Sequence, residues 1–205
     1  MSISKSASYH HGNLRQALID AAVGALQTEG IEALSLRKLA KDIGVSHNAP
    51  YMHFEDKEAL LAAIAEEGFK RLAEAIEGAF EQAGAGWTER FQGGCTAYVG
   101  FMVEHSAYAQ VMFRTYDSAK NPSFSTAAAA ALHLLEVLIQ EGQAAGHVAP
   151  GNSRRWTILT WSLLHGVSTL FGASGHSLPP LGQITPEELT RRSIESLYLG
   201  LKPRG

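Results

Sequence analysis

Two groups of residues in this chain could do chemistry: a set of histidines with a single cysteine, and a crowded polar segment near residue 50. The chain has nine histidines and one cysteine, Cys95, and His133 and Glu136 share an HxxE spacing. Such groups could bind a metal or supply a nucleophile. The sequence has no HExxH, ExxH, CxxC, GxSxG or GxxxxGK pattern, which those reactions use. We therefore expect no enzyme, no metal site and no cofactor.

The second group is the segment GVSHNAPYMHF, residues 44 to 54, whose side chains suit contact with DNA. Amide and imidazole groups can hydrogen-bond to base edges in the major groove, and hydroxyl, imidazole and ammonium groups can donate to phosphates. Side chains expected to enter the groove are His47, Asn48 and Ala49. Those expected to donate to phosphates are Tyr51, His53 and the later Lys57. The simpler alternative is that Tyr51 and Phe54 are core residues, and for Phe54 we adopt it.

Helical spacing of apolar residues predicts the elements that hold this segment. A first helix runs from Asn13 to Gly30, and a second begins at the N-cap Ser35 and stops before Gly44. Ser46 can cap a short third helix, in which Pro50 lies early enough to cost little. Asp56 can cap a long fourth helix that ends near residue 80. The second and third helices, joined at Gly44, form a helix-turn-helix.

The remainder of the chain also shows only helical signals. Helices are expected from Glu89 to Tyr116 with a break near His105, from Ser125 to Ala145, and from Ser153 to Ala173. A final helix follows Thr185, an N-cap with proline at the next position. No window alternates with the period of a strand. The predicted fold is all-α, with about nine helices.

Residues 11 to 65 resemble the amino-terminal domain of the tetracycline-repressor (TetR) family. The shared marks are a glycine closing the first helix, a Ser-Leu-Arg start to the second, Gly-Val at the turn, and Tyr-x-His-Phe followed by lysine. In this chain they are Gly30, Ser35-Leu36-Arg37, Gly44-Val45, Tyr51-Met52-His53-Phe54 and Lys57. Pro50 departs from the family pattern, where leucine is common. The register of the base-reading residues is therefore open.

This resemblance implies a polar arm over residues 1 to 10, a DNA-binding domain over residues 11 to 65, and an effector-binding and dimerisation domain over residues 66 to 205. It implies a ligand-responsive regulator, most often a repressor, that binds a palindromic operator as a homodimer and is released by a small molecule. The sequence leaves open the alternative that the ligand promotes DNA binding. Residues implied at phosphates are Ser35, Arg37, Ser46, Tyr51, His53 and Lys57. Residues implied at or near base edges are Arg37, His47, Asn48 and Ala49.

The segment WSLLHG, residues 161 to 166, resembles the Trp-His-Gly signature of one class of ligand domain in that family. The resemblance implies a four-helix dimer seam made with the last helix. The residues expected there are Trp161, His165, Gly166, Leu197 and Leu201. The alternative is that the tryptophan and histidine only fill a packed helix surface.

An aromatic and sulfur-rich set between residues 91 and 113 is a candidate lining for an effector pocket. Aromatic rings and sulfur atoms line adaptable apolar pockets, although most of this set could be core. The candidates are Phe91, Cys95, Tyr98, Met102, His105 and Phe113.

Composition supports a cytoplasmic protein without a membrane span. The formal net charge of -3 does not by itself indicate a polyanion partner, and the single cysteine fits a reducing compartment. The apolar stretch from Ala127 to Ile139 is interrupted by His133 and Glu136. One alternative remains beside the enzyme: a helical interaction protein that has lost DNA binding.

Overall fold

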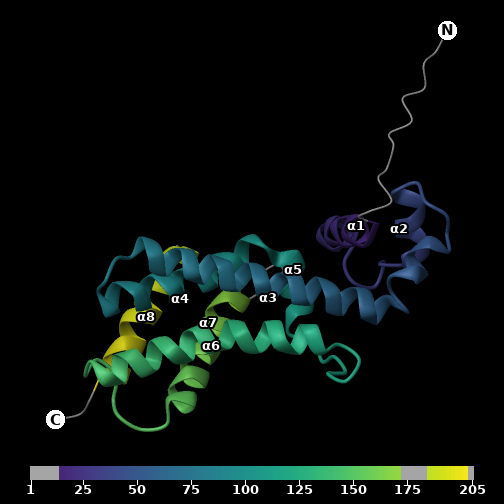
Figure 1. The fold of residues 1–205 in the computed structure, drawn as a ribbon. Coiled ribbons are helices and arrows are strands. Elements are labelled where there is room, and N and C mark those ends of the chain that lie inside the picture. Colours follow the sequence, from purple (N-terminus) through teal and green to yellow (C-terminus); the bar gives the residue numbers. More distant parts are fainter. Residues whose placement is uncertain (1–13, 172–183, 203–205) are drawn as a thin grey trace. The chain divides into compact units, whose positions relative to one another are not determined.

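The structure, a computed structural model, describes residues 14–171 and 184–202 (Figure 1). The chain divides into two compact units, residues 1–63 and 64–205. Among the described residues there are eight α-helices, one 3-10 helix and no strand. The all-α prediction is therefore confirmed. The polar arm, Asn13, the end of the helix predicted to reach Ala173, and the linker up to residue 183 lie outside the described residues.

The first unit contains three short elements and the start of a long helix. They are α1 (Leu14–Thr28), α2 (Leu36–Asp42), the 3-10 helix η2 (Ala49–Met52) and the first residues of α3 (Lys57–Gln82). The elements α1, α2 and η2 pack against one another. Their shared core holds Leu18 and Leu26 of α1, Leu39 and Ala40 of α2, and Phe54, each at most 3% exposed.

Several predicted helix ends are confirmed by the hydrogen bonds that cap them. The Ser35 side chain accepts from the Lys38 N–H at 3.5 Å, and the Asp56 carboxylate accepts from the Ala59 N–H at 2.8 Å. Thr185 accepts from the Glu188 N–H at 3.2 Å. A side-chain cap contributes about 1 kcal/mol. These local bonds define where α2, α3 and α8 begin.

The third helix differs from the prediction. The Ser46-capped helix is absent; in its place η2 begins at Ala49, after Asn48, which makes no side-chain capping bond. Pro50 accounts for the difference because it has no N–H to give to an α-helical ladder. Its carbonyl instead accepts from the N–H groups of both His53 and Phe54, each at 3.0 Å.

The second unit is a helical bundle arranged around α4. Its helices are the remainder of α3, α4 (Trp87–Glu104), α5 (Ser106–Met112), α6 (Pro122–Ala144), α7 (Ser153–Phe171) and α8 (Pro186–Leu201). Helix α4 contacts α5, α6, α7 and α8, and α7 also contacts α6 and α8. The expected break near His105 is confirmed between α4 and α5. Two helices begin earlier than predicted, α4 at Trp87 and α6 at Pro122, where proline suits the first helical position.

Trp87 anchors one end of this bundle. Its ring stacks on Phe91 at 5.0 Å and on His147 at 5.1 Å between centroids, and its indole N–H donates to the Leu138 carbonyl at 2.7 Å. Gly142 of α6 lies directly under the ring, since an added Cβ would come within 2.5 Å of Trp87 Cε2. A glycine at this position is therefore required by the close approach of the indole.

Helix α6 is long and apolar enough, judged by length and composition alone, to cross a membrane. The core helices of globular proteins pass the same test and are mostly buried, whereas 22% of the apolar window of α6 is buried. Here Leu138 and Ile139 are at most 1% exposed and α6 packs on α4 and α7. Its apolar composition therefore has a structural use within the bundle.

Candidate functional site

The first candidate site is the turn and 3-10 helix over residues 43 to 54. Gly44 has φ = 75°, a conformation that favours glycine, and the Val45 N–H donates to the Ala40 carbonyl at 2.9 Å. Pro50 is buried and Phe54 is 3% exposed, so these two side chains hold the segment on the core. After the turn, the exposed residues of this segment are Ser46, His47, Asn48, Tyr51, Met52 and His53, and Ala49 is half-buried.

Most of the sequence-predicted DNA contacts are exposed on this unit. The exposed ones are Ser35, Arg37, Ser46, His47, Asn48, Tyr51 and His53. Ala49 and Lys57 are half-buried. The segment therefore brings together hydroxyl, imidazole and amide groups over one short stretch. Such groups can reach base edges and phosphates when a recognition element enters a major groove.

Met52 is a candidate that the sequence reasoning missed. Its side chain is 84% exposed, although it is apolar, and it lies between Tyr51 and His53 in η2. An exposed apolar group can contact the methyl group of thymine. The signal available in the sequence was an apolar residue within a polar run at the variable position of Tyr-x-His-Phe.

Some of the cationic side chains near this segment already contact other residues and are less available to DNA phosphates. Lys38 forms an ion pair with Glu29, and the Arg15 guanidinium lies over the Phe54 ring at 5.4 Å from its centroid. Arg37 and Lys41 are exposed on α2. The positive charge that can meet phosphates is therefore local, in accordance with a chain of net charge -3.

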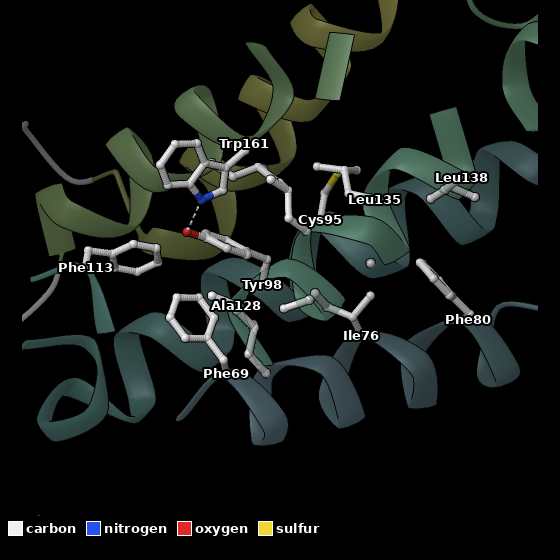
Figure 2. A pocket seen from close by; sticks show the side chains of 15 residues that line it. Phe69, Ile76, Phe80, Cys95, Tyr98, Phe113, Ala128, Leu135, Leu138 and Trp161 are labelled. Atoms are coloured by element: carbon white, nitrogen blue, oxygen red, sulfur yellow. Dashed lines mark hydrogen bonds between the residues drawn. The ribbon is translucent and has the colours of Figure 1, made fainter. Parts of the chain in front are cut away.

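The second candidate site is a cavity of about 190 Å³ inside the second unit (Figure 2). It lies between α3, α4, α6 and α7, with Phe113 from the segment after α5. The lining residues are Phe69, Leu72, Ile76, Phe80, Gly94, Cys95, Tyr98, Phe113, Ala128, Ala131, Leu132, Leu135, Leu138, Trp161 and Leu164. None carries a formal charge.

The polar atoms of the cavity gather at one end. The Tyr98 hydroxyl accepts from the Trp161 indole N–H at 3.1 Å and lies 3.2 Å from His165 Nδ1. Figure 2 shows Tyr98 and Trp161 near Phe113, with Phe80 and Leu138 at the opposite end. Burial raises the pKa of Tyr98, and burial lowers the pKa of His165. Both side chains are therefore neutral near neutral pH.

The predicted pocket residues separate into two sets. Cys95, Tyr98 and Phe113 line the cavity. The structure places the other three elsewhere: Phe91 stacks on Trp87, Met102 is buried further along α4, and His105 is exposed at the end of α4. Burial raises the pKa of the Cys95 thiol, which keeps it protonated and poorly nucleophilic.

Sequence reasoning missed most of the cavity wall, which comes from α3 and α6. The α3 residues Phe69, Leu72, Ile76 and Phe80 recur at threes and fours, a spacing that equally describes core. The five α6 residues lie in an alanine- and leucine-rich run. Neither pattern distinguishes a packed interface from a cavity.

Helix α7 has two apolar faces. Trp161 and Leu164 line the cavity, whereas Ile158, Leu159, Leu163 and Leu170 are 36–48% exposed. Among the residues predicted at a dimer interface, Gly166 is exposed with no atom within 4 Å of an added Cβ, and Leu197 is half-buried. The structure places Leu201 in the core, 1% exposed, and turns Trp161 and His165 toward Tyr98.

In the described ranges, 14–171 and 184–202, no group of three or more His, Cys, Asp or Glu side chains is placed to hold a metal ion.

Comparison with known proteins matches both units of the chain. Residues 18–64 match the family described as bacterial regulatory proteins, tetR family, and residues 91–197 match the family described as tetracyclin repressor-like, C-terminal domain. The chain is similar to the Tetracycline repressor protein class D of Escherichia coli, with 43% identity over 53 residues, which are 26% of this chain and 24% of that protein. The match thus spans about a quarter of the relative's length.

Solved structures resemble the chain over nearly its whole length. A protein of unknown function from Rhodococcus sp. RHA1 has a TM-score of 0.83 and 35% identity, covering 95% of this chain and 98% of that one. A bacterial regulatory protein in the tetR family from Rhodococcus RHA1 has a TM-score of 0.72 and 22% identity, covering 93% and 98%. The second likeness concerns the fold alone.

Proposed function

Because the chain belongs to the tetR family of bacterial regulatory proteins, we propose that it is a repressor that binds a palindromic operator as a homodimer and is released by a small molecule. Members of this family regulate transcription and are not enzymes. The observation that carries the proposal is the outward-facing polar segment over residues 46 to 53, held by the buried Pro50 and Phe54. The proposed location is the cytoplasm, where operator DNA is found.

The proposed DNA contacts divide by chemistry. Asn48 can form a bidentate pair with adenine, and His47 can donate to or accept from a base edge. The Asn48 side chain makes no capping bond in η2, so its amide is available. Met52, with 84% exposure, adds a contact to a thymine methyl group. The proposed phosphate contacts are Ser35, Arg37, Ser46, Tyr51, His53 and Lys57.

The proposed dimer uses the outward face of α7 together with α8. Large apolar side chains are exposed on both helices. They are Ile158, Leu159, Leu163 and Leu170 of α7, and Leu199 of α8, which is 66% exposed. Gly166, which has open space beside it, lets a partner helix approach closely. Trp161 and His165, from the segment that resembles a Trp-His-Gly signature, serve the cavity in this proposal.

The proposed release by ligand requires that the ligand bind one arrangement of the dimer better than another. One helix, α3, begins at Lys57 and also carries four residues of the cavity wall. A ligand that shifts this helix can therefore change the position of the DNA-contacting segment. A coupling of roughly 2 kcal/mol would change operator affinity about thirtyfold.

A two-stage experiment tests this function. Gel shifts of the full chain with genomic fragments identify the operator, and thermal-shift screening of metabolites and antibiotics then provides compounds for operator-release assays. The proposal predicts a specific shifted fragment and at least one compound that releases it. Failure to shift any fragment would favour the alternative, a helical interaction protein that has lost DNA binding.

A further inference from the structure

The chemistry of the cavity restricts what can bind in it. Its volume of about 190 Å³ is somewhat larger than a roughly 150 Å³ apolar protein cavity that holds benzene, and below the range of drug-sized pockets. The middle of the wall is aliphatic and the ends are aromatic. An occupant of roughly six to ten non-hydrogen atoms fits this space.

Among the residues that the structure describes, none that lines the cavity is a lysine or an arginine that could receive an anionic occupant. The Arg90 guanidinium lies over the ring of one lining residue, Phe80, at 5.4 Å from its centroid. Its charge is already met by Glu141, at 2.8 Å. At the polar end His165 is neutral, since burial lowers its pKa. The cavity is partly open, but a carboxylate held inside its wall would lose its hydration without gaining a counter-charge, which is costly.

The Tyr98 hydroxyl has one hydrogen-bonding capacity left over. A phenolic oxygen carries one proton and can accept two hydrogen bonds. It accepts one from Trp161 and shares one bond with His165 Nδ1. If Tyr98 donates to His165, one acceptor position remains for a donor; if His165 donates, the Tyr98 proton remains for an acceptor. A ligand hydroxyl satisfies either arrangement because it both donates and accepts.

We propose that the effector is a neutral, largely apolar alcohol or phenol whose single hydroxyl bonds to Tyr98 and whose apolar part fills the space between α3 and α6. The proposal rests on the proposed function, because it names the ligand class of the same cavity. In this proposal the cluster of Tyr98, Trp161 and His165 recognises the hydroxyl of the ligand. The rest of the wall limits the size of the ligand.

Two matched pairs of probes test this ligand class on the full chain: octanol against octanoate, and benzyl alcohol against benzoate. Binding is followed by the fluorescence of Trp161, with Trp161→Phe to assign the signal, and by the shift in melting temperature. We expect at least one alcohol to bind at least tenfold more tightly than its carboxylate. Equal or tighter binding by the carboxylates, or no binding by either alcohol near its solubility limit, overturns the proposal.

Variants locate the binding. Tyr98→Phe removes only the hydroxyl and should weaken alcohol binding roughly fivefold to tenfold, the value of one hydrogen bond. Tyr108→Phe is the matched control, since the Tyr108 hydroxyl donates to Glu67 at 2.8 Å and does not line the cavity. Ala131→Phe should fill the space and abolish binding. Melting curves establish that each variant folds, and equal alcohol affinity in Tyr98→Phe and Tyr108→Phe contradicts the assigned role of Tyr98.

Operator assays with the same probes separate this proposal from the proposed function. Alcohol binding that leaves operator affinity unchanged supports the ligand chemistry and counts against release by ligand. Operator release by a charged compound, together with failure of both alcohols to bind, overturns the ligand class and supports the proposed function.

Discussion

In the first unit the functional candidates lie mostly exposed on α2 and on the turn and 3-10 helix over residues 43 to 54, whereas in the second they line a cavity walled by four helices. The first set is polar and close together in sequence. The second is apolar and drawn from residues 69 to 164. DNA recognition needs exposed hydrogen-bonding groups, and binding of an apolar ligand needs enclosure. The first unit therefore offers a surface for hydrogen bonds to DNA, and the second offers a cavity for an apolar ligand.

The largest effect that links the two units is expected from the proposed dimer face. Leu159→Asp combined with Leu163→Asp would place charges in an apolar seam, where each unpaired charge costs several kcal/mol. We expect a monomer in sedimentation and an operator affinity lower by roughly 100-fold or more, about 2.7 kcal/mol. Gln92→Asp, at an exposed position of α4, is the control. A double variant that stays dimeric would place the interface on another surface.

Two substitutions at the proposed DNA contacts should weaken DNA binding in different ways. Asn48→Ala should lose about 1–3 kcal/mol at one base pair and relax the sequence preference there. Lys57→Ala should weaken binding to all sequences and reduce the salt slope by about 1 for each protomer of the dimer. Affinity measured over a salt series and a set of operator variants distinguishes them. A changed preference with an unchanged salt slope in Lys57→Ala would contradict the division into base and phosphate contacts.

The extent to which the sequence predicted these sites follows from how local each one is. The helix-turn-helix was predictable because Ser35, Gly44 and Asp56 act on neighbours within a few residues. The cavity was not, because its wall depends on how α3 and α6 register against α4. Apolar residues have helical spacing on two faces of α7. The sequence therefore could not show that the face with Trp161 and His165 is the one that turns toward Tyr98. The 3-10 form of η2 was not predicted, because Pro50 was expected to be tolerated in a short helix capped by Ser46.

Substitutions at two helical glycines of the second unit test the close packing around Trp87. Gly142→Ala should push the Trp87 indole from its place and lower the stability by about 1–3 kcal/mol, or the melting temperature by roughly 2–12 °C. Gly100→Ala, also within a helix but with no atom within 4 Å of the added Cβ, should be neutral or slightly stabilising. Equal melting temperatures for both variants would contradict the close packing at Trp87.

The smallest effect is expected from pH acting on His165. Burial lowers the pKa of this imidazole below its ordinary value of 6.5, so the unfolded chain binds a proton more readily than the folded one. The stability associated with the neutral ring is present above pH 6.5 and is lost as the pH falls below it. Melting temperatures between about pH 7.5 and pH 5.5 should fall less in His165→Gln than in the native chain. Parallel pH profiles would contradict the lowered pKa of the half-buried His165 imidazole.

The central claim, that a homodimer reads DNA through residues 46 to 53, is tested most directly by random-site selection with the full chain. Two recognition elements in successive major grooves lie about 34 Å apart, one helical turn of DNA. The account predicts an enriched, imperfect palindrome whose half-sites face the same side of the duplex, and loss of preference at one symmetric position in Asn48→Ala. Enrichment of a motif without dyad symmetry, or no enrichment at all, would contradict it.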